Sequence, residues 1–226
     1  NYSNPTPTSL CVGGTVAFSV EVTGGLGGTI TWIRSETSGG AGTTVITGDA
    51  PAVGTWYYRP HYEPTGSGCN LADGTETMVT VSADPTWTSY SLPTPTSLCV
   101  GGTVAFGVSV TGGLGGEITW IRSNNPTPLA GTETVVTSGD APGVGTWYYR
   151  PHYTPTGSGC DLADGTQTTV TVSADPSWTS YSLPTPTSLC VGGTVAFSVS
   201  TTGGLGGTIT WIRSNNPTPL AGTETV

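Results

Sequence analysis

Short segments in which apolar and polar residues alternate follow one another along the chain, and none has the spacing of an amphipathic helix. In residues 103–111, "TVAFGVSVT", every second side chain from Val104 to Val110 is apolar, which is typical of a half-buried strand. The next predicted strands are residues 117–123 with Ile118 and Trp120 inward, 132–138, 145–153 with Trp147 and Tyr149 on one face, and 165–174 with Val170 and Val172 inward. Gly- and Pro-rich turns separate them. The pattern therefore predicts an all-β chain.

The alternation returns because the sequence is repetitive. Residues 91–106, "SLPTPTSLCVGGTVAF", recur unchanged at 182–197 and with one substitution at 3–18. A repeat of about 90 residues is the size of a small sandwich domain and too long for a solenoid repeat. We therefore expect three units: residues 1–83, whose N-terminal strand is incomplete, residues 84–174, and residues 175–226, which are truncated.

Each complete unit combines six or seven short strands with a tryptophan between two cysteines, in the order Cys99, Trp120, Cys160 in the second unit. This combination predicts an immunoglobulin-like β-sandwich, and such domains in tandem predict an extended rod. The cysteines depart from the antibody arrangement, because Cys99 precedes its strand and Cys160 follows the strand "TWYYR" in a loop. A bridge between them would join loops or strand ends instead of pinning the two sheets through the core.

The five cysteines indicate an oxidising compartment, because one pair recurs per complete unit at similar spacing. We expect bridges Cys11–Cys69 and Cys99–Cys160, with the partner of Cys190 beyond residue 226. The geometry leaves an alternative open, since the two cysteines of a unit could fall at opposite ends of a sandwich and a disulfide spans only about 4–7 Å between Cα atoms. The alternative is bridges between units or between chains.

The ordered motifs "LCVGGTVAFSV", "TGGLGGTITWIR", "GTWYYRP", "GSGC" and "TVTVSADP" resemble the immunoglobulin-like repeats of very large Bacteroidetes surface proteins. That group includes cell-surface adhesins of the gliding-motility type, exported by the type IX secretion route. The resemblance covers every unit from end to end. It implies an extracellular fibre of tandem β-sandwiches with a structural or adhesive role.

The segments that join the units have a composition of their own. "ADPTW" and "ADPSW" combine an Asp-Pro step, which stiffens the chain, with a tryptophan that we expect to bury against an adjoining unit. The residues expected to stiffen these joints are Asp84, Pro85, Trp87, Asp175, Pro176 and Trp178.

Arginines at the ends of two predicted neighbouring strands are the most notable charges. Arg34 follows "TITWI" and Arg59 follows "TWYY". The interpretation that we favour is that each guanidinium packs on a tyrosine or pairs with an aspartate. The alternative is an aromatic and basic strip that binds a glycan or a neighbouring fibre. The residues of this possible strip are Arg34, Tyr57, Arg59, Arg122, Tyr148 and Arg150.

Composition and motifs argue against several function classes. The net charge of −9, with no lysine, would repel phosphate backbones, so we expect no nucleic-acid partner. No stretch has the length and apolarity of a membrane span, so we expect no membrane insertion in this segment. We expect no enzyme and no catalytic residues, because His61 and His152 have no acid or cysteine at the spacing of a triad.

We expect no metal site and no cofactor. The nearest candidates are Asp73 and Asp164, which read as ordinary Asp-Gly turns, and calcium at the joints near Asp84 and Asp175, which would stiffen a fibre. "TGGLGG" opens a strand rather than a helix and therefore reads as a turn, not a phosphate loop.

The predicted function is an extracellular structural or adhesive filament on a bacterial surface, with neighbouring repeats of the same chain as its main partners. Two alternatives stay open: an array of glycan-binding modules attached to a larger secreted protein, and a subunit of a laterally assembling fibre or sheath. The partners would then be surface glycans or other copies of the filament.

Overall fold

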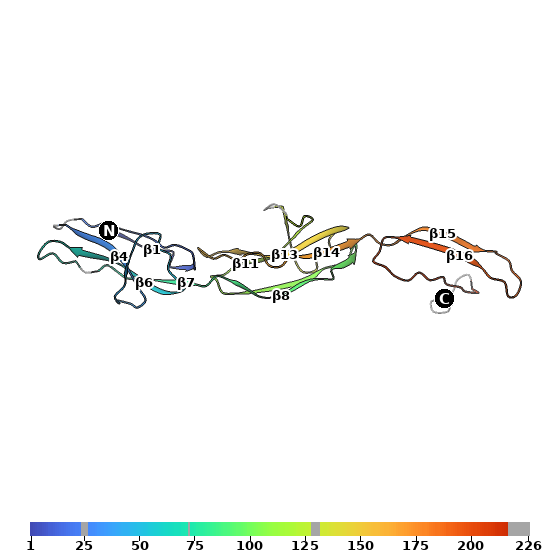
Figure 1. Ribbon diagram of the computed structural model, residues 1–226, viewed down its shortest axis with the longest axis horizontal. Coiled ribbons are helices and arrows are strands. Elements are labelled where there is room, and N and C mark those ends of the chain that lie inside the picture. Colours follow the sequence, from blue (N-terminus) through green and yellow to red (C-terminus); the bar gives the residue numbers. More distant parts are fainter. Residues whose placement is uncertain (24–26, 72, 128–131, 217–226) are drawn as a thin grey trace.

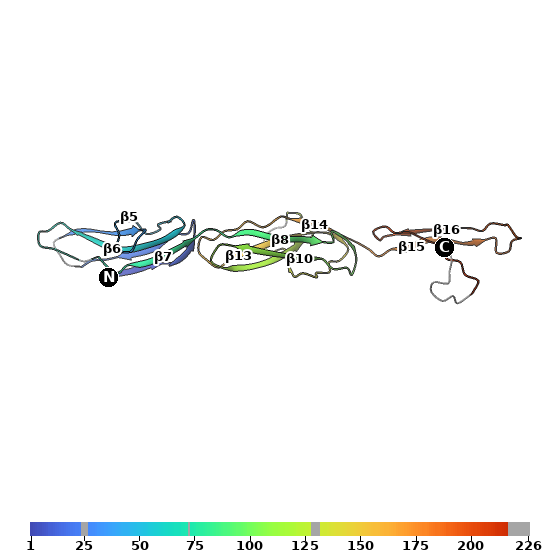
Figure 2. The same cartoon turned by 90° about the horizontal axis from the view of Figure 1, so that it is seen from below.

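The computed structural model describes residues 1–216 except 24–26, 72 and 128–131. Every regular element in these residues is a β-strand. Three units follow one another in a row along the long axis of the molecule, and two perpendicular views agree on this arrangement (Figures 1 and 2). The protein is therefore an all-β chain of tandem immunoglobulin-like units, as the sequence predicts.

The first unit is a sandwich of a five-stranded and a two-stranded sheet, with strand orders β2-β7-β6-β4-β5 and β1-β3. Its strands are β1 (Tyr2–Thr6), β2 (Ser9–Cys11), β3 (Ala17–Val20), β4 (Gly28–Ser35), β5 (Thr43–Val45), β6 (Gly54–Pro64) and β7 (Thr77–Ser82). Strand β2 runs parallel to β7, and the other neighbours are antiparallel. Because β2 is parallel to β7, Cys11 at its end lies beside Ser82, where the chain leaves the unit.

The second unit repeats this topology, with sheets β9-β14-β13-β11-β12 and β8-β10. Its strands are β8 (Thr86–Thr94), β9 (Ser97–Cys99), β10 (Ala105–Thr111), β11 (Gly116–Ser123), β12 (Thr134–Val136), β13 (Gly145–Pro155) and β14 (Thr168–Ser173). Registers of β11 on β13 and of β4 on β6 match residue for residue. The two units are therefore copies in structure as well as in sequence.

Each complete unit has its own core between the two sheets. In the second unit the core residues are Leu98, Val104, Phe106, Trp120, Tyr149, Val170 and Val172. The ring centres of Phe106 and Trp120 lie 4.8 Å apart. The predicted inward positions Trp120, Val170 and Val172 are confirmed, but Ile118 is exposed. Ile118 lies near the start of β11, and Tyr153, which pairs with it on β13, is buried, so the exposure is local to the Ile118 side chain.

The third unit has one sheet, formed by β15 (Ser177–Thr185) and β16 (Ala196–Thr202). The segment 208–214 does not form a strand. Its equivalent, β11, is paired over eight residues with β13, and the 226 residues contain no third copy of β13. The strand expected to start at 223–226 lies outside the described residues. An apolar hollow of about 350 Å³, lined by Trp178, Tyr181, Val199, Ile209 and Trp211 among others, remains on this unit.

Candidate functional site: the joint between units

A disulfide crosses the joint between the first two units. It links Cys11 to Cys160, 149 residues apart, with 4.7 Å between their Cα atoms. Cys69, Cys99 and Cys190 are free thiols. The expected pairings Cys11–Cys69 and Cys99–Cys160 are therefore wrong. The reason is that the two cysteines of a unit lie too far apart. In each unit the first cysteine lies where the chain leaves the sandwich and the second lies at the other end.

A backbone contact accompanies the disulfide. The amide of Cys11 donates to the carbonyl of Ser158 over 2.8 Å, and a parallel bridge joins Leu10 to Ser158. Both sides of this contact are glycine-rich turns: "LCVGG", residues 10–14, comes from the first unit, and "GSGC", residues 157–160, comes from the second. We call these the exit turn and the entry turn, because each lies where the chain leaves or enters its unit.

Glycine is required at Gly159 of the entry turn and fits closely at Gly14 of the exit turn. Gly159 has a φ of +77°, and a Cβ atom there would lie 2.3 Å from the amide nitrogen of Gly14. A Cβ atom on Gly14 would lie 3.0 Å from the carbonyl oxygen of Ser158. Only glycine allows both the left-handed conformation and this backbone approach. The exit and entry turns are therefore complementary surfaces.

The linker forms the third part of the joint. The amide of Gly113, in the turn between β10 and β11, donates to the carbonyl of Ala83 over 3.1 Å. A Cβ atom on Gly112 would lie 3.0 Å from the carbonyl oxygen of Asp84, and Pro85 is fully buried. The "TGGLGG" segment is thus a turn, as predicted, and it packs against the linker.

The same linker contacts recur at the second joint. The amide of Gly204 donates to the carbonyl of Ala174 over 2.8 Å. A Cβ atom on Gly203 would lie 2.6 Å from the carbonyl oxygen of Asp175, and one on Gly204 would lie 3.2 Å from Cβ of Pro176. The aspartates and prolines expected at the joints therefore lie there in both cases.

The joint tryptophans do not have the expected role. Trp87 belongs to β8 and donates its indole N–H to the carbonyl of Ala163, in its own unit, over 2.9 Å. Trp178 is 64% exposed. The expectation that they bury against an adjoining unit is therefore wrong. Strand β8 begins at Thr86, so the side chain of residue 87 already belongs to the sandwich that follows.

The arginines of the possible binding strip lie on two faces of one sheet. Arg34 pairs with Tyr58 across β4 and β6, whereas Arg59 pairs with Ile33, and directly opposite residues share a face. Tyr57 lies two residues from Arg59 and therefore on its face. The register of the second unit is the same, so Arg122 lies opposite Tyr149, whereas Tyr148 and Arg150 lie on the other face. The structure therefore does not bring the six residues into one strip.

On the inner face, Arg34 is part of a partly buried cluster. Its guanidinium donates to both carboxylate oxygens of Asp49, over 2.8 and 2.9 Å, and lies 4.5 Å from the ring centre of Trp56. Tyr58 donates its hydroxyl to the same aspartate over 2.6 Å, and burial, together with this aspartate, raises the pKa of Tyr58 well above its ordinary value. Arg122, Asp140, Trp147 and Tyr149 repeat the cluster in the second unit.

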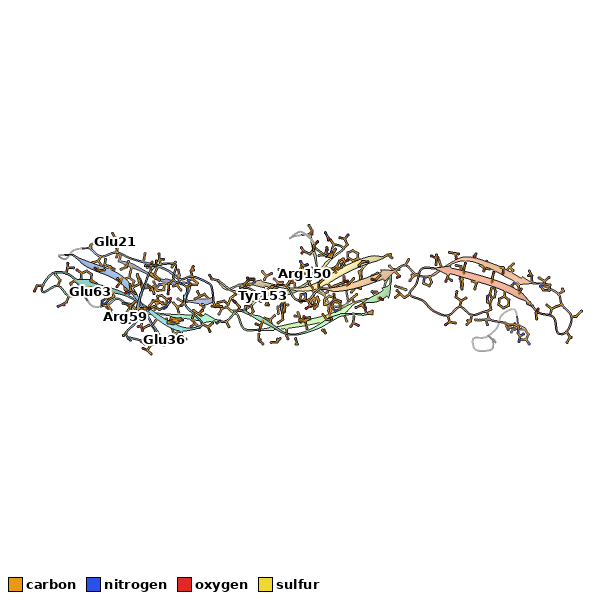
Figure 3. All side chains as sticks on the ribbon, viewed as in Figure 1. Glu21, Glu36, Arg59, Glu63, Arg150 and Tyr153 are labelled. Atoms are coloured by element: carbon orange, nitrogen blue, oxygen red, sulfur yellow. A yellow bond between two sulfur atoms is a disulfide. The ribbon has the colours of Figure 1, made fainter. Side chains whose placement is uncertain are left out.

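On the outer face, Arg59 and its equivalent Arg150 (labelled in Figure 3) bind carboxylates. Arg59 Nε donates to Asp73 over 2.6 Å, and the other oxygen of Asp73 lies 2.6 Å from Nδ1 of His61. This hydrogen bond with His61, followed by the Arg59 contact, holds the pKa of Asp73 below its ordinary value. Arg150, Asp164 and His152 form the same contacts. Each histidine thus has an acid partner twelve residues further on, which the sequence reading missed.

One carboxylate of the outer cluster changes its position between the units. Glu76, just before β7, lies 3.7 Å from Arg59. The equivalent residue of the second unit is Gln167. There Glu133, just before β12, binds Arg150 over 2.7 Å, and the residue of the first unit aligned with it is Gly42. Each arginine therefore keeps one glutamate, supplied by a different strand.

Metal binding has no geometric support in the described part of the chain. Within it, no three His, Cys, Asp or Glu side chains come close enough to share an ion. Asp73 and Asp164 are engaged by arginine and histidine. Calcium at the joints, a candidate and not an expectation of the sequence, stays untested. Within the same residues we find no apolar helix of membrane-spanning length.

The residues that build the joint include several that sequence reasoning missed: Gly14, Gly112, Gly113, Ser158 and Gly159. A signal for them was present. The exit turn occurs three times without change, and the entry turn occurs twice without change, whereas the loop of residues 35–47 differs from its counterpart in length and sequence.

Comparisons with known proteins give little further information. No protein-family model matches the sequence, and no curated protein matches it. A solved structure to which the chain is similar contains the N-terminal eight Ig domains of Down Syndrome Cell Adhesion Molecule (DSCAM) isoform 1.30.30. The similarity covers 77% of this chain and 24% of that one, at 14% identity and a TM-score of 0.37. At this level it carries no argument about function.

Proposed function

We propose that the chain is a segment of an extracellular structural or adhesive filament, in which immunoglobulin-like units form a rod that holds other parts of the protein away from a bacterial surface. The observation that carries this proposal is the Cys11–Cys160 disulfide. It fixes two consecutive units end to end, and the exit and entry turns contribute a backbone hydrogen bond beside it. A rod needs such a constraint because short linkers alone leave relative domain motion as the default.

The chemistry of the joint supports an extracellular location. Disulfides persist in oxidising environments and are rare in the cytosol. The resemblance of the repeats to Bacteroidetes surface adhesins exported by type IX secretion supports the same placement, as does an acidic surface without lysine. We propose a structural rather than a catalytic role, since sandwich units in tandem serve a rod by adding length.

A glycan-binding array has less support. The arginines of the possible binding strip have carboxylate partners and lie on two faces of the sheet. A laterally assembling fibre has only the exposed apolar residues of the third unit in its favour. Both remain alternatives, with surface glycans or further copies of the chain as partners.

Antibodies raised against residues 1–174 test the location and the form of the protein. On intact cells we expect immunogold labelling of fibres that project from the surface. Labelling only after permeabilisation would contradict the proposal. Small-angle scattering of the oxidised and reduced chain tests the rod itself: reduction should broaden the distribution of overall lengths, and an unchanged distribution would show that the disulfide does not hold the joint.

A further inference from the structure

The free thiols Cys69 and Cys99 lie in the same local structures as the bridged cysteines. The amide of Cys69 donates to Gly66 over 3.4 Å, and that of Cys160 donates to Gly157 over 3.4 Å. Gly68 has a φ of +78°, against +77° for Gly159. The entry turn of the first unit therefore has the conformation that receives an exit turn, although no exit turn contacts it here.

The exit turn of the second unit is likewise preformed. The amide of Val100 donates to Ser173 over 2.9 Å, as Val12 donates to Ser82 over 3.0 Å. The amide of Gly102 donates to Cys99 over 3.0 Å, as Gly14 donates to Cys11 over 3.1 Å. Cys99 therefore occupies, at the second joint, the position that Cys11 occupies at the first.

The glycines show how the free turns differ from the bridged ones. At Gly159 an added Cβ atom would collide with Gly14, whereas at Gly68 it would meet nothing within 4 Å. At Gly102 the nearest atoms belong to Leu98 and Cys99 of its own unit, without the carbonyl of a neighbour that Gly14 meets. The free turns therefore have the conformation of the bridged turns but lack the neighbouring backbone that fills the joint at Gly14 and Gly159.

We propose that Cys69 and Cys99 are the two halves of the same inter-unit disulfide. Cys99 takes the cysteine of the entry turn of a following unit, and Cys69 takes the cysteine of the exit turn of a preceding unit. The partner in each case is another repeat of this type. The inference rests on the rod proposed above. It states that every joint of the rod holds one disulfide, which always links an exit turn to an entry turn.

Formation of each bridge needs an oxidant, which we take to be a small disulfide such as glutathione disulfide. One thiolate attacks the external disulfide, forms a mixed disulfide and releases one thiol. The second cysteine thiolate then attacks the cysteine sulfur of the mixed disulfide and releases the other thiol. Two cysteine thiols are oxidised and one external disulfide is reduced to two thiols.

The test extends the full chain until its third unit is complete. Val226 aligns with Val135, so a copy of residues 136–174 appended after Val226 supplies the missing entry turn. The appended copy carries T154S as a mass marker, at an exposed position. Cleavage at acidic residues places Cys99 and Cys190 in peptides of different sequence. Shorter peptides of residues 91–106 and 182–197 would be identical and could not be told apart.

After oxidation with glutathione disulfide and alkylation, we expect a peptide that joins Cys99 to the appended cysteine. Alkylated Cys99 should fall to the level of alkylated Cys11 in the same digest. A control chain with serine in place of the appended cysteine should keep Cys99 alkylated. Mixing equal amounts of isotopically heavy and light chains distinguishes the sources: bridges within one chain give no heavy–light linked peptide, whereas bridges between chains give about half of the linked peptides as heavy–light pairs. Either supports the proposal.

Cys99 that stays alkylated in the extended chain while Cys11–Cys160 forms would overturn this inference and leave the rod intact. Loss of Cys11–Cys160 itself would instead contradict the proposed function. Material extracted from cells without reductant and alkylated at once gives a second measurement, which does not depend on folding of the extended chain. There every entry-turn cysteine should be linked to an exit-turn cysteine, and links between two turns of the same kind would overturn the proposal.

Discussion

Replacement of Cys160 by serine should destabilise the first two units together. The bridge joins residues 149 positions apart, and in the chain-entropy model a loop of this length restricts the unfolded chain by about 5 kcal/mol at 25 °C. Full relaxation of the loop requires both units to unfold, so we assign about half of this value, roughly 2.5 kcal/mol, to each unit. That is a large part of the stability of a small domain.

Urea unfolding followed by tryptophan fluorescence measures the effect. With a slope of about 1–2 kcal/mol per molar urea, each midpoint should fall by roughly 1–2.5 M. Cys69→Ser is the matched control, since Cys69 is the equivalent residue of the first unit and is a free thiol in this chain. Equal shifts in the two variants, or no shift in C160S, would refute the assignment of the bridge to the joint.

Three further results are expected. A peptide of residues 175–226 should show no cooperative unfolding transition as a monomer, because its apolar face is open; a sharp melt by circular dichroism would contradict this. Trp87→Ala should lower the stability of the second unit by about 1–2 kcal/mol and leave interdomain angles in scattering unchanged, whereas Trp178→Ala, at an exposed position, should alter stability by less than about 0.5 kcal/mol. Folding lowers the pKa of Asp73, so the contribution of Asp73 to stability is complete above its unfolded pKa and is lost as the pH falls below roughly 4. Asp73→Asn should therefore flatten the acid limb of the plot of unfolding free energy against pH. An unchanged acid limb would contradict the pairing of Asp73 with His61 and Arg59.

The fold could be predicted because the information for it is local. Alternation in segments such as 103–111 and the placement of Trp120 specify strands and an inward face. The same patterns recur in each unit of the chain. Residues 208–214, the counterpart of β11, form no strand because the strand that would pair with them is lacking. At Ile118 the alternation is the same as at the buried Trp120, so the pattern could not distinguish the exposed position from the buried one.

The disulfide could not be predicted from one unit taken alone. Spacing along the chain suggests pairing within a unit, but the parallel pairing of β2 with β7 takes Cys11 to the exit end of its sandwich. The distance to Cys160 then depends on how two units stack. Likewise, the acid partner of His61 lies on a loop that returns beside β6, and such proximity follows from the fold and not from sequence spacing.

The glutamate that binds the outer arginine comes from a different segment in each unit, and this difference has a consequence for the folding of near-identical neighbouring units. Adjacent similar domains risk exchanging elements while they fold. If the segment with Arg59 and Glu76 completed the second unit, it would meet Glu133 there, and two glutamates and an aspartate would crowd one arginine. The segment with Arg150 and Gln167 would meet Gly42 in the first unit and lose its glutamate. The charged hydrogen bond that is lost in this second exchange contributes about 1.5–3 kcal/mol. The position of the glutamate therefore makes a native unit electrostatically different from an exchanged one, although the two sequences are nearly identical.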